Sequence, residues 1–496
     1  MDLGNIDSLR AFYPELLLTA VTLGIILIDL VSKDKSWLGE AALVSTAGAL
    51  LLLGVEPVGG GAWLFSRMLV YDSFAIFFRA LISLAAMVAV WMSIGSEEVQ
   101  KCEQGEYYAI LLASTLGMLL MAESTNLLMA YLALEFVSLT SYVLTGILKH
   151  NRRSQEAALK YLIYGGVASG TMIYGMSWIF GLAGSLDFSI INRVLFATGH
   201  IPVLAVFIAL VLILSGMGYK VASVPFHMWA PDVYEGAPIP ITTFLAVGSK
   251  AAGFALMTRF FYPAISHLTS GGNWQALSGV AWPQLLLIVC IVTMTLGNLA
   301  ALQQQNMKRM LAYSSIAQAG YALMGFVLLS NDGLEAMLVY LFAYYVMDAG
   351  AFLVVMIVAN LTGSEDIEAY KGLAWRSGGA VPAIALTIFL LSLTGIPATI
   401  GFIGKFYVFA AAIREQFYIL AIIGILNSVV SLYYYMRPVK EMFLEEPGAQ
   451  AAAVTPEYWN YSLMGVLALA TVFLGLYPPP IIAFAARSLR FFIGPA

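Results

Sequence analysis

The residues best suited to chemistry are charged side chains inside long apolar segments. Lys220 and Lys250 stand on either side of a Pro-rich interruption in the stretch 214–259. A lysine near the middle of a bilayer costs about 2.5–3.5 kcal/mol on insertion scales, so one that is kept there usually faces the protein interior and takes part in transport. The two lysines therefore predict a path for ions.

Glu135 supplies an acid, near the centre of the apolar run LLMAYLALEFVSLTSYVLTG. Lys220 is its expected partner, because a carboxylate stabilises a buried ammonium and makes the proton affinity of the pair depend on their separation. His227 follows Lys220 beyond Pro225 and titrates near neutral pH, which suits a relay from Lys220 to Lys250. The alternatives are structural: a protonated Glu135 that hydrogen-bonds neighbouring helices, and a His227 that only packs.

A second interrupted segment, LLSLTGIPATIGFIGKFYVFAAA, carries Gly395 and Pro397 before Lys405. Two helices broken by Gly and Pro, each with an interior lysine, are typical of transporters built from inverted repeats. Asp348, in LVYLFAYYVMDAGAFLVV, is a further acid at membrane depth, with either a proton-transfer role or a protonated structural one. Lys405 and Asp348 therefore join the candidates for proton transfer.

Other charged residues have simpler explanations. Asp232 and Glu235 lie among Pro and Gly, where acids usually cap helices or shape loops. Lys308 and Arg309 end a polar turn and suit a cytoplasmic anchor. Arg79 lies near a helix end, where its side chain is expected to reach the membrane surface.

The composition predicts the helices that would position these residues. Hydrophobic residues make up 60% of the 496 residues and charged ones 11%, and the mean hydropathy is +0.85. These values predict an all-α polytopic membrane protein. Apolar runs of roughly 20 residues predict about fourteen transmembrane helices. They cover 14–32, 41–55, 73–95, 106–122, 125–147, 159–183, 201–223, 239–262, 283–302, 310–330, 334–361, 380–411, 417–437 and 459–480.

We expect two inverted five-helix repeats among these helices, with the seventh and twelfth helices broken. The resulting division is 1–105 for helices one to three, 106–262 for the first repeat, 283–440 for the second, and 459–496 for the last helix and an interfacial tail. The connection 184–200 is too polar to span and is expected to lie along the surface.

The positive charges in the loops predict the orientation. Loops after odd-numbered helices carry more Lys and Arg than the opposite loops, and the run KHNRR at 149–153 is the clearest cluster. Such loops remain in the cytoplasm, so both termini are expected on the outer, periplasmic side of a bacterial cytoplasmic membrane. Asp2 and Asp7 stand where a signal peptide needs positive charge, so the first helix is expected to be retained.

Several function classes are excluded. A net charge of -5 without a long basic run makes nucleic acid an unsuitable partner. Cys102 and Cys290 are too few for an iron–sulfur cluster, which needs about four thiolates. The sequence has no Gly-rich dinucleotide turn and no helical histidine pair for haem. The chain is therefore expected to carry no cofactor, and redox chemistry must take place elsewhere.

Long motifs carry a family resemblance between about residues 110 and 440. The segments EFVSLTSYVLTG, KVASVPFHMWAPDVYEGAPIPITTFLAVGSKAAGFA, NMKRMLAYSSIAQAGY and GIPATIGFIGKFYVF resemble the N-type antiporter-like membrane subunit of respiratory complex I, the proton-translocating NADH–quinone oxidoreductase. The segment APDVYEG favours the N-type over the sister M- and L-type subunits. Asp348 and Ala398 depart from the family pattern, which more often has Asn and Pro there.

The resemblance implies roles for residues that match the family motifs. Glu135, Lys220, Lys250 and Lys405 would form a hydrated chain at mid-membrane that moves protons, coupled to quinone reduction in a neighbouring part of the complex. It also implies partners: the lipid bilayer, an M-type antiporter-like subunit and small K-, J- and A-type membrane subunits. NADH, FMN, iron–sulfur clusters and quinone would be held by partner subunits.

Two other functions remain open from the residues alone. One is a subunit of a Mrp-type cation/proton antiporter, for which Na⁺ dependence is the test. The other is a structural membrane subunit whose polar residues hold helices together without moving protons.

Overall fold

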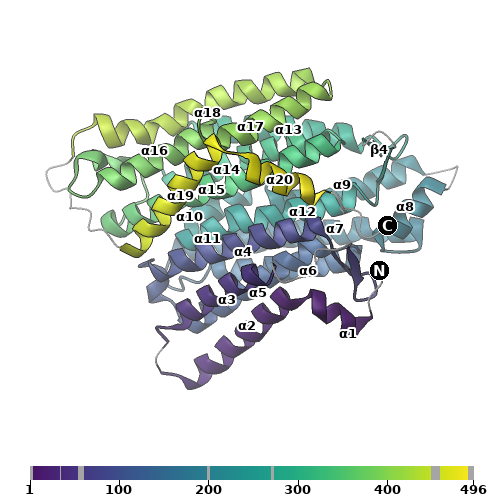
Figure 1. Ribbon diagram of the computed structural model, residues 1–496, viewed down its shortest axis with the longest axis horizontal. Helices are drawn as coiled ribbons and strands as arrows, with labels where there is room; N and C mark the ends of the chain where they lie inside the picture. Colours follow the sequence, from purple (N-terminus) through teal and green to yellow (C-terminus); the bar gives the residue numbers. More distant parts are fainter. Residues whose placement is uncertain are drawn as a thin grey trace.

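Helices make up almost all of the structure, a computed structural model that describes residues 4–33, 35–53, 61–197, 202–269, 273–447 and 458–489. They lie side by side as an elongated bundle (Figure 1). Their bounds are α1 Asn5–Ser8, α2 Tyr13–Val31, α3 Leu38–Leu52, α4 Ser73–Ile94, α5 Gln104–Glu123, α6 Leu127–Thr145, α7 Arg152–Ala183, α8 Phe188–Ala197, α9 Val203–Val221, α10 Trp229–Gly236, α11 Ile239–Phe244, α12 Lys250–Phe261, α13 Trp282–Ala301, α14 Met307–Val327, α15 Asn331–Thr362, α16 Ala380–Thr394, α17 Ile400–Arg414, α18 Tyr418–Leu444, α19 Tyr458–Leu476 and α20 Pro479–Ser488.

Short elements connect these helices. The strands form two antiparallel hairpins, β1 (Ala62–Leu64) with β2 (Leu69–Tyr71) and β3 (Ser266–Leu268) with β4 (Trp274–Ala276). The 3₁₀ turns are Leu9–Ala11, Val99–Lys101, Ile367–Tyr370 and Leu373–Trp375. The predicted all-α fold class is confirmed, because the hairpins lie only in connections.

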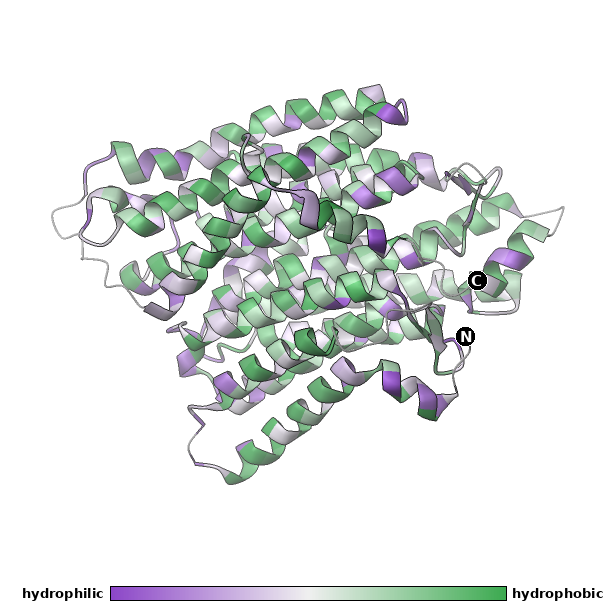
Figure 2. Ribbon diagram, viewed as in Figure 1, coloured by the Kyte–Doolittle hydropathy of each residue, from purple (hydrophilic) through white to green (hydrophobic). Residues whose placement is uncertain are grey.

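Each of the fourteen expected ranges coincides with a helix or with helices on either side of a break. Among the described residues, eleven helices are long and apolar enough to cross a membrane, by length and composition alone. The other three ranges correspond to the shorter α3, to the less apolar α7 and to the broken pair α16 and α17. Hydrophobic residues dominate the helices, and hydrophilic ones are frequent in the loops at both ends of the bundle (Figure 2). The number of crossings stays a prediction.

The two predicted helix breaks are present. Between α9 and α10, Ala222 adopts the left-handed conformation and a cis Val224–Pro225 bond follows. Between α16 and α17, Gly395 and Ala398 are both left-handed, with φ of 94° and 68°. Proline lacks the donor that would continue a helix, and glycine adopts positive φ without steric cost, so both breaks have a local cause.

A third irregularity was not predicted. The expected eighth helix, 239–262, changes to a π-turn over Leu245–Ser249 before it resumes as α12 at Lys250. Such turns often occur at functional sites. It contains one glycine, Gly248, and no proline, and a single glycine inside an apolar run does not predict a break.

Burial is highest at the centre of the bundle. The apolar part of Ile239–Phe261 is 100% buried, and α14 and α15 are each 94% buried, whereas α2 is only 22% buried. Figure 1 places α2 and α18 along opposite edges of the bundle. The candidate lysine Lys250 therefore lies on the most enclosed helix of the described chain.

Two pairs of helices have matching ends. Asn126 caps α6 and forms a bridge with Asp187, which follows α7. In the same way Asn306 caps α14 and forms a bridge with Asp366, which follows α15. Both α7 and α15 are 32 residues long. Because α6 and α7 belong to the first expected repeat and α14 and α15 to the second, these equivalent pairings are what a repeated structure requires.

The two expected surface segments contain short helices. The connection 184–200 holds α8. The tail forms α20, which packs on α4 through Phe484 and Phe77, with ring centroids 5.2 Å apart. The end of the expected tail, 490–496, lies outside the described residues. The position of both helices at a membrane surface stays a prediction.

Candidate functional site

Lys250 is the first residue of α12, and its side chain is buried. Its ammonium nitrogen donates to the backbone oxygen of Ser315 on α14 at 2.5 Å and also contacts the Ser315 hydroxyl. The hydroxyl of Tyr344, on α15, lies 2.8 Å from the Ser315 hydroxyl and 2.9 Å from Oδ2 of Asp348. A line of polar groups therefore joins Lys250 to Asp348, and the structure brings these two candidates together.

The neighbouring residue Ser314 opens a second polar line. Its hydroxyl contacts the hydroxyl of Tyr435 on α18. The amide of Gln318 donates to the same Tyr435 oxygen at 3.1 Å, and the Tyr340 hydroxyl donates to the Gln318 carbonyl. All four side chains are buried. Because Ser314 and Ser315 are adjacent on α14, this polar cluster lies next to Lys250.

Lys405 lies in a separate group of polar side chains. It lies in α17, just beyond the second helix break, and donates to the backbone oxygen of Thr394 at 2.9 Å and to the Ser428 hydroxyl at 3.1 Å. Its ammonium also lies 4.5 Å from the ring centroid of Tyr321, which accepts a hydrogen bond from Ser428. A Cβ atom on Gly395 would lie 2.9 Å from Cδ of Lys405. The break therefore supplies both a carbonyl and the space for this lysine.

Lys220 and Glu135 are less directly connected. Lys220 is buried near the end of α9, and its stem packs against Gly253 of α12, where an added Cβ would lie 3.4 Å from Lys220 Cγ. The Lys220 ammonium and Oε1 of Glu135 are buried and make no hydrogen bond, and no ion pair within 4.0 Å joins the two residues. The structure places Lys220 beside the Lys250 helix but does not bring it into direct contact with Glu135.

His227 lies in the break between α9 and α10. Its ring is buried, and Nδ1 has no hydrogen-bond partner. The same break is held against α13 by the backbone N–H of Val224, which donates to the Thr293 hydroxyl at 3.0 Å. No hydrogen bond joins His227 to Lys220 or Lys250, so the expected relay has no direct contacts in this structure.

The expected capping role of Asp232 and Glu235 is wrong. Asp232 pairs with Lys160 of α7 at 2.6 Å and with Arg309 of α14 at 2.7 Å, and Glu235 pairs with Arg309 at 2.7 Å. The first turn of α10 has no side-chain cap. The acids instead tie α10 to both neighbouring helices, and only the packing of those helices brings the bases within reach.

The expected surface position of Arg79 is also wrong. Its side chain is fully buried, between Glu15 of α2 and Glu123 of α5. A second buried pair at the same end of the bundle joins Arg259 and Asp72 at 2.6 Å. Neither group was predicted from the sequence, although the acids and arginines that flank apolar runs at one end of the bundle are a signal that could have found them.

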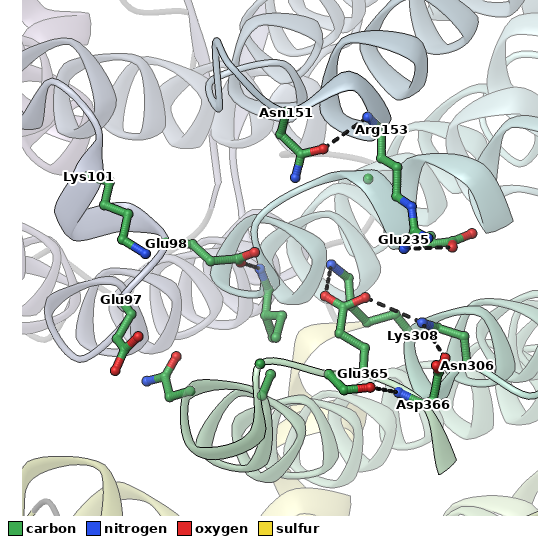
Figure 3. A pocket seen from close by; sticks show the side chains of 16 residues that line it. Glu97, Glu98, Lys101, Asn151, Arg153, Glu235, Asn306, Lys308, Glu365 and Asp366 are labelled. Carbon is green, nitrogen blue, oxygen red and sulfur yellow. Dashed lines mark hydrogen bonds and ion pairs between the residues drawn. The ribbon is translucent and has the colours of Figure 1, made fainter. Parts of the chain in front are cut away.

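Lys308 does more than anchor a loop. It is buried, and its ammonium donates to the backbone oxygen of Ala237 at 2.8 Å and to Glu365 at 2.7 Å. It borders a polar hollow of about 330 Å³, with Glu98 on one side and Glu365 on the other (Figure 3). Since Ala237 connects α10 to α11, the hollow reaches the connection between the helices that carry Lys220 and Lys250.

Within the described residues, no group of three or more His, Cys, Asp and Glu side chains could hold a metal ion. Lys250, Ser315, Tyr344 and Asp348 are in hydrogen-bond contact across α12, α14 and α15, an arrangement through which a proton can pass.

Known proteins resemble this chain over nearly its whole length. The family described as "NADH:quinone oxidoreductase/Mrp antiporter, TM" matches residues 124–431. A relative from Chlorobium chlorochromatii, named "NADH-quinone oxidoreductase subunit N", is 45% identical, over 98% of this chain and 95% of its own. A chain in respiratory complex I from Thermus thermophilus is 30% identical, with a TM-score of 0.79 over 95% of this chain and 99% of that one. A chain of the Mrp complex from Dietzia, 19% identical with a TM-score of 0.81 over 98% of both chains, shares the fold.

Proposed function

The chain belongs to the NADH:quinone oxidoreductase/Mrp antiporter family, as an N-type antiporter-like membrane subunit of complex I, and on this premise we propose that its buried Glu, Lys and His side chains move protons. The chain takes part in NADH–quinone oxidoreduction as a membrane subunit, and its own task is ion translocation. The candidates are Glu135, Lys220, His227, Lys250 and Lys405, with Asp348 in addition.

The observation that carries this proposal is the polar line from Asp348 through Tyr344 and Ser315 to Lys250. Hydroxyl groups can donate one hydrogen bond while they accept another, so they can pass a proton between a lysine and an acid. Lys250 would release its proton towards Ser315 and take one up again, and Asp348 would stabilise the positive charge of the protonated lysine.

The first part of the route needs water. The Lys220 ammonium and Oε1 of Glu135 are both buried without a protein partner. Buried polar groups of this kind are usually satisfied by ordered water. Water molecules between Glu135 and Lys220, and around Nδ1 of His227, would complete the connection that the protein atoms leave open.

The last part of the route ends at Lys405. The side chains of Ser314, Gln318 and Tyr435 lead from the Lys250 cluster towards α18, and Ser428 of α18 accepts a hydrogen bond from Lys405. We propose that a change of charge near Lys220, arriving from a neighbouring subunit, drives a proton along this sequence of groups to Lys405.

We also propose that residues 106–262 and 283–440 are the two inverted repeats. Their support is the equivalent pairing of Asn126 with Asp187 and of Asn306 with Asp366. Glu135 and Ser315 stand at the same spacing from these two capping residues. The acid of the first repeat and the serine that contacts Lys250 in the second would therefore occupy corresponding places.

The partners follow from the family. We propose M-type and small K-, J- and A-type membrane subunits as neighbours, with NADH, FMN, iron–sulfur clusters and quinone bound in other subunits. We further propose a bacterial cytoplasmic membrane as the location, with both termini on the periplasmic side, because loops after odd-numbered helices carry the larger share of Lys and Arg.

A Mrp-type cation/proton antiporter subunit is the second candidate. The fold shared with the Dietzia chain supports it, at an identity of 19%. The relative named as subunit N is 45% identical and favours the first candidate. Pumping that depends on Na⁺ would favour the antiporter.

The decisive experiment measures protons moved for each NADH oxidised in vesicles that contain the assembled complex. Lys220→Ala and Glu135→Gln should each lower this ratio, because each removes a charged group from the route. Lys149→Ala is the control, since Lys149 is an exposed loop residue with one long ion pair of 3.4 Å. Pumping at the wild-type ratio in both Lys220→Ala and Glu135→Gln would contradict the proposal.

A further inference from the structure

Two acids face one arginine inside the bundle, away from the Lys250 cluster. Arg79 of α4 donates through Nε to Oε1 of Glu123 at 2.7 Å, and the same Nε lies 3.0 Å from Oε1 of Glu15. The terminal nitrogen of Arg79 donates to Oε2 of Glu15 at 3.2 Å and to the backbone oxygen of Ala11 at 3.1 Å. All three charged side chains have no exposure to solvent.

The remaining carboxyl oxygens have unusual surroundings. Oε1 of Glu15 and Oε2 of Glu123 are buried and receive no hydrogen bond. Oε1 of each glutamate lies within 3.0 Å of the same Arg79 nitrogen, so the two carboxyl groups lie close together. Two buried carboxylates that face each other repel, and their oxygens can only accept, so a single proton between them would remove the repulsion and satisfy an oxygen on each.

The charges nearby do not supply another partner. The ring of Tyr71 lies 5.3 Å from the Arg79 guanidinium and carries no charge. Arg259 is held by Asp72 through two hydrogen bonds of 2.6 Å, and its Nε donates to the backbone oxygen of Ala122. Arg259 and Asp72 therefore neutralise each other, and the two glutamates have Arg79 as their one shared cation among the described residues.

We propose that Glu15 and Glu123 form a proton-binding site that holds one proton between them at neutral pH. With that proton the group is neutral: one carboxylate balances Arg79 and the other carboxyl is an acid. Burying the extra negative charge without a counterion would be costly, and the proton removes that cost. The site is separate from the proposed route, and its existence does not depend on that route.

The site formed by Glu15 and Glu123 lies at the ends of two helices. Glu15 lies in the first turn of α2, and Glu123 is the last residue of α5. With the predicted orientation both residues lie at the periplasmic ends of their helices. The bound proton therefore lies near the outer side of the membrane, on helices that carry none of the candidate lysines.

The test compares neutralising variants in the assembled complex. Glu15→Gln and Glu123→Gln should each be tolerated, because the amide N–H₂ can replace the shared proton while the other carboxylate still balances Arg79. The double variant should lose most of the assembled subunit, since Arg79 would then be buried without a countercharge. Asp72→Asn is the matched control: it keeps an acceptor for the α4 cap but removes the carboxylate that pairs with Arg259.

Infrared difference spectra separate proton binding from a structural role. The carbonyl-stretch band of a protonated carboxylic acid, shifted by exchange into D₂O, should be present in the wild-type complex and missing from both single variants. The proposal would be overturned by a band that persists in both variants, by a single variant that loses the subunit as fully as Asp72→Asn does, or by a double variant that assembles normally.

Discussion

Lys250 and Asp348 lie on different helices and are joined by two hydroxyl groups instead of an ion pair. Ser315 contacts the lysine, Tyr344 contacts the aspartate, and the two hydroxyls lie 2.8 Å apart. In a direct ion pair each charge would hold the other in place. Intervening hydroxyls can reorient, so this arrangement lets a change at one residue reach the other without moving a helix.

We predict that Tyr344→Phe slows proton pumping by roughly five- to ten-fold, because a lost hydrogen bond in the route costs about 1 kcal/mol or more. The ring, which lies 5.5 Å from the Lys250 ammonium, would remain. Tyr345→Phe is the control, since that hydroxyl donates to the backbone oxygen of Leu84 outside the cluster. Pumping should be measured in vesicles with the assembled complex, and equal rates in the two variants would count against the bridge.

Gly395→Ala should lower both stability and pumping. Alanine in the left-handed conformation costs roughly 1–2 kcal/mol, and here its Cβ would also press on Lys405. Gly363→Ala carries the same backbone strain but has open space around the added Cβ. We expect similar losses of thermal stability in both variants and a loss of pumping in Gly395→Ala alone. A normal pumping ratio in Gly395→Ala would show that the position of Lys405 does not matter.

Replacing each of two neighbouring glycines of α7 by alanine should have opposite effects on stability. A Cβ on Gly165 would collide with the Tyr142 hydroxyl and lie 2.8 Å from the hydroxyl of Tyr219, next to Lys220. Overpacking of this kind typically costs about 1–3 kcal/mol, so Gly165→Ala should lower the melting temperature. Gly166 has open space, and Gly166→Ala should be neutral or stabilising by up to about 1 kcal/mol. Thermal unfolding of both purified variants tests the contrast.

Arg309 should contribute more to stability than an exposed arginine does. Its guanidinium pairs with Asp232 and Glu235 and joins α14 to α10, so Arg309→Gln should destabilise by about 1–2 kcal/mol. Arg414 pairs with Asp332 at an exposed site, where ion pairs contribute little, and Arg414→Gln should leave the melting temperature unchanged. Equal effects in the two variants would contradict a role for Arg309 in holding the helices.

Chemical labelling of the native Cys102 thiol tests the predicted orientation of the chain in the membrane. It is half-buried in the loop after α4, whereas Cys290 is fully buried. A membrane-impermeant maleimide should therefore label the subunit only from the cytoplasmic side. Burial and the nearby Glu98 raise the pKa of the Cys102 thiol, so the thiolate is scarce at neutral pH and labelling should speed up as the pH rises. Cys102→Ser is the control, and labelling from the periplasmic side would reverse the orientation.

The helices and their breaks could be predicted because their causes are local. A run of about 20 apolar residues, or a glycine and proline inside it, acts on the same stretch of chain that displays it. Glu135, Lys220, Lys250 and Lys405 stood out for the same reason, since a charge in an apolar run is visible in the sequence. The π-turn before Lys250 was not predicted, because its one glycine, Gly248, stands in an apolar run without a proline.

The partners of the charged residues were decided by the tertiary structure. Arg79 looked like a helix-end residue, yet the packing of α2, α4 and α5 encloses it with Glu15 and Glu123. Asp232 looked like a cap, yet α7 and α14 bring Lys160 and Arg309 to it. The sequence by itself determined which segments form long apolar helices and which of them carry charge. Only the rotation and contact of helices far apart in the chain decided which charges meet, because hydropathy is nearly uniform around helices such as α5 and α14 and does not fix the face that each one turns to its neighbour.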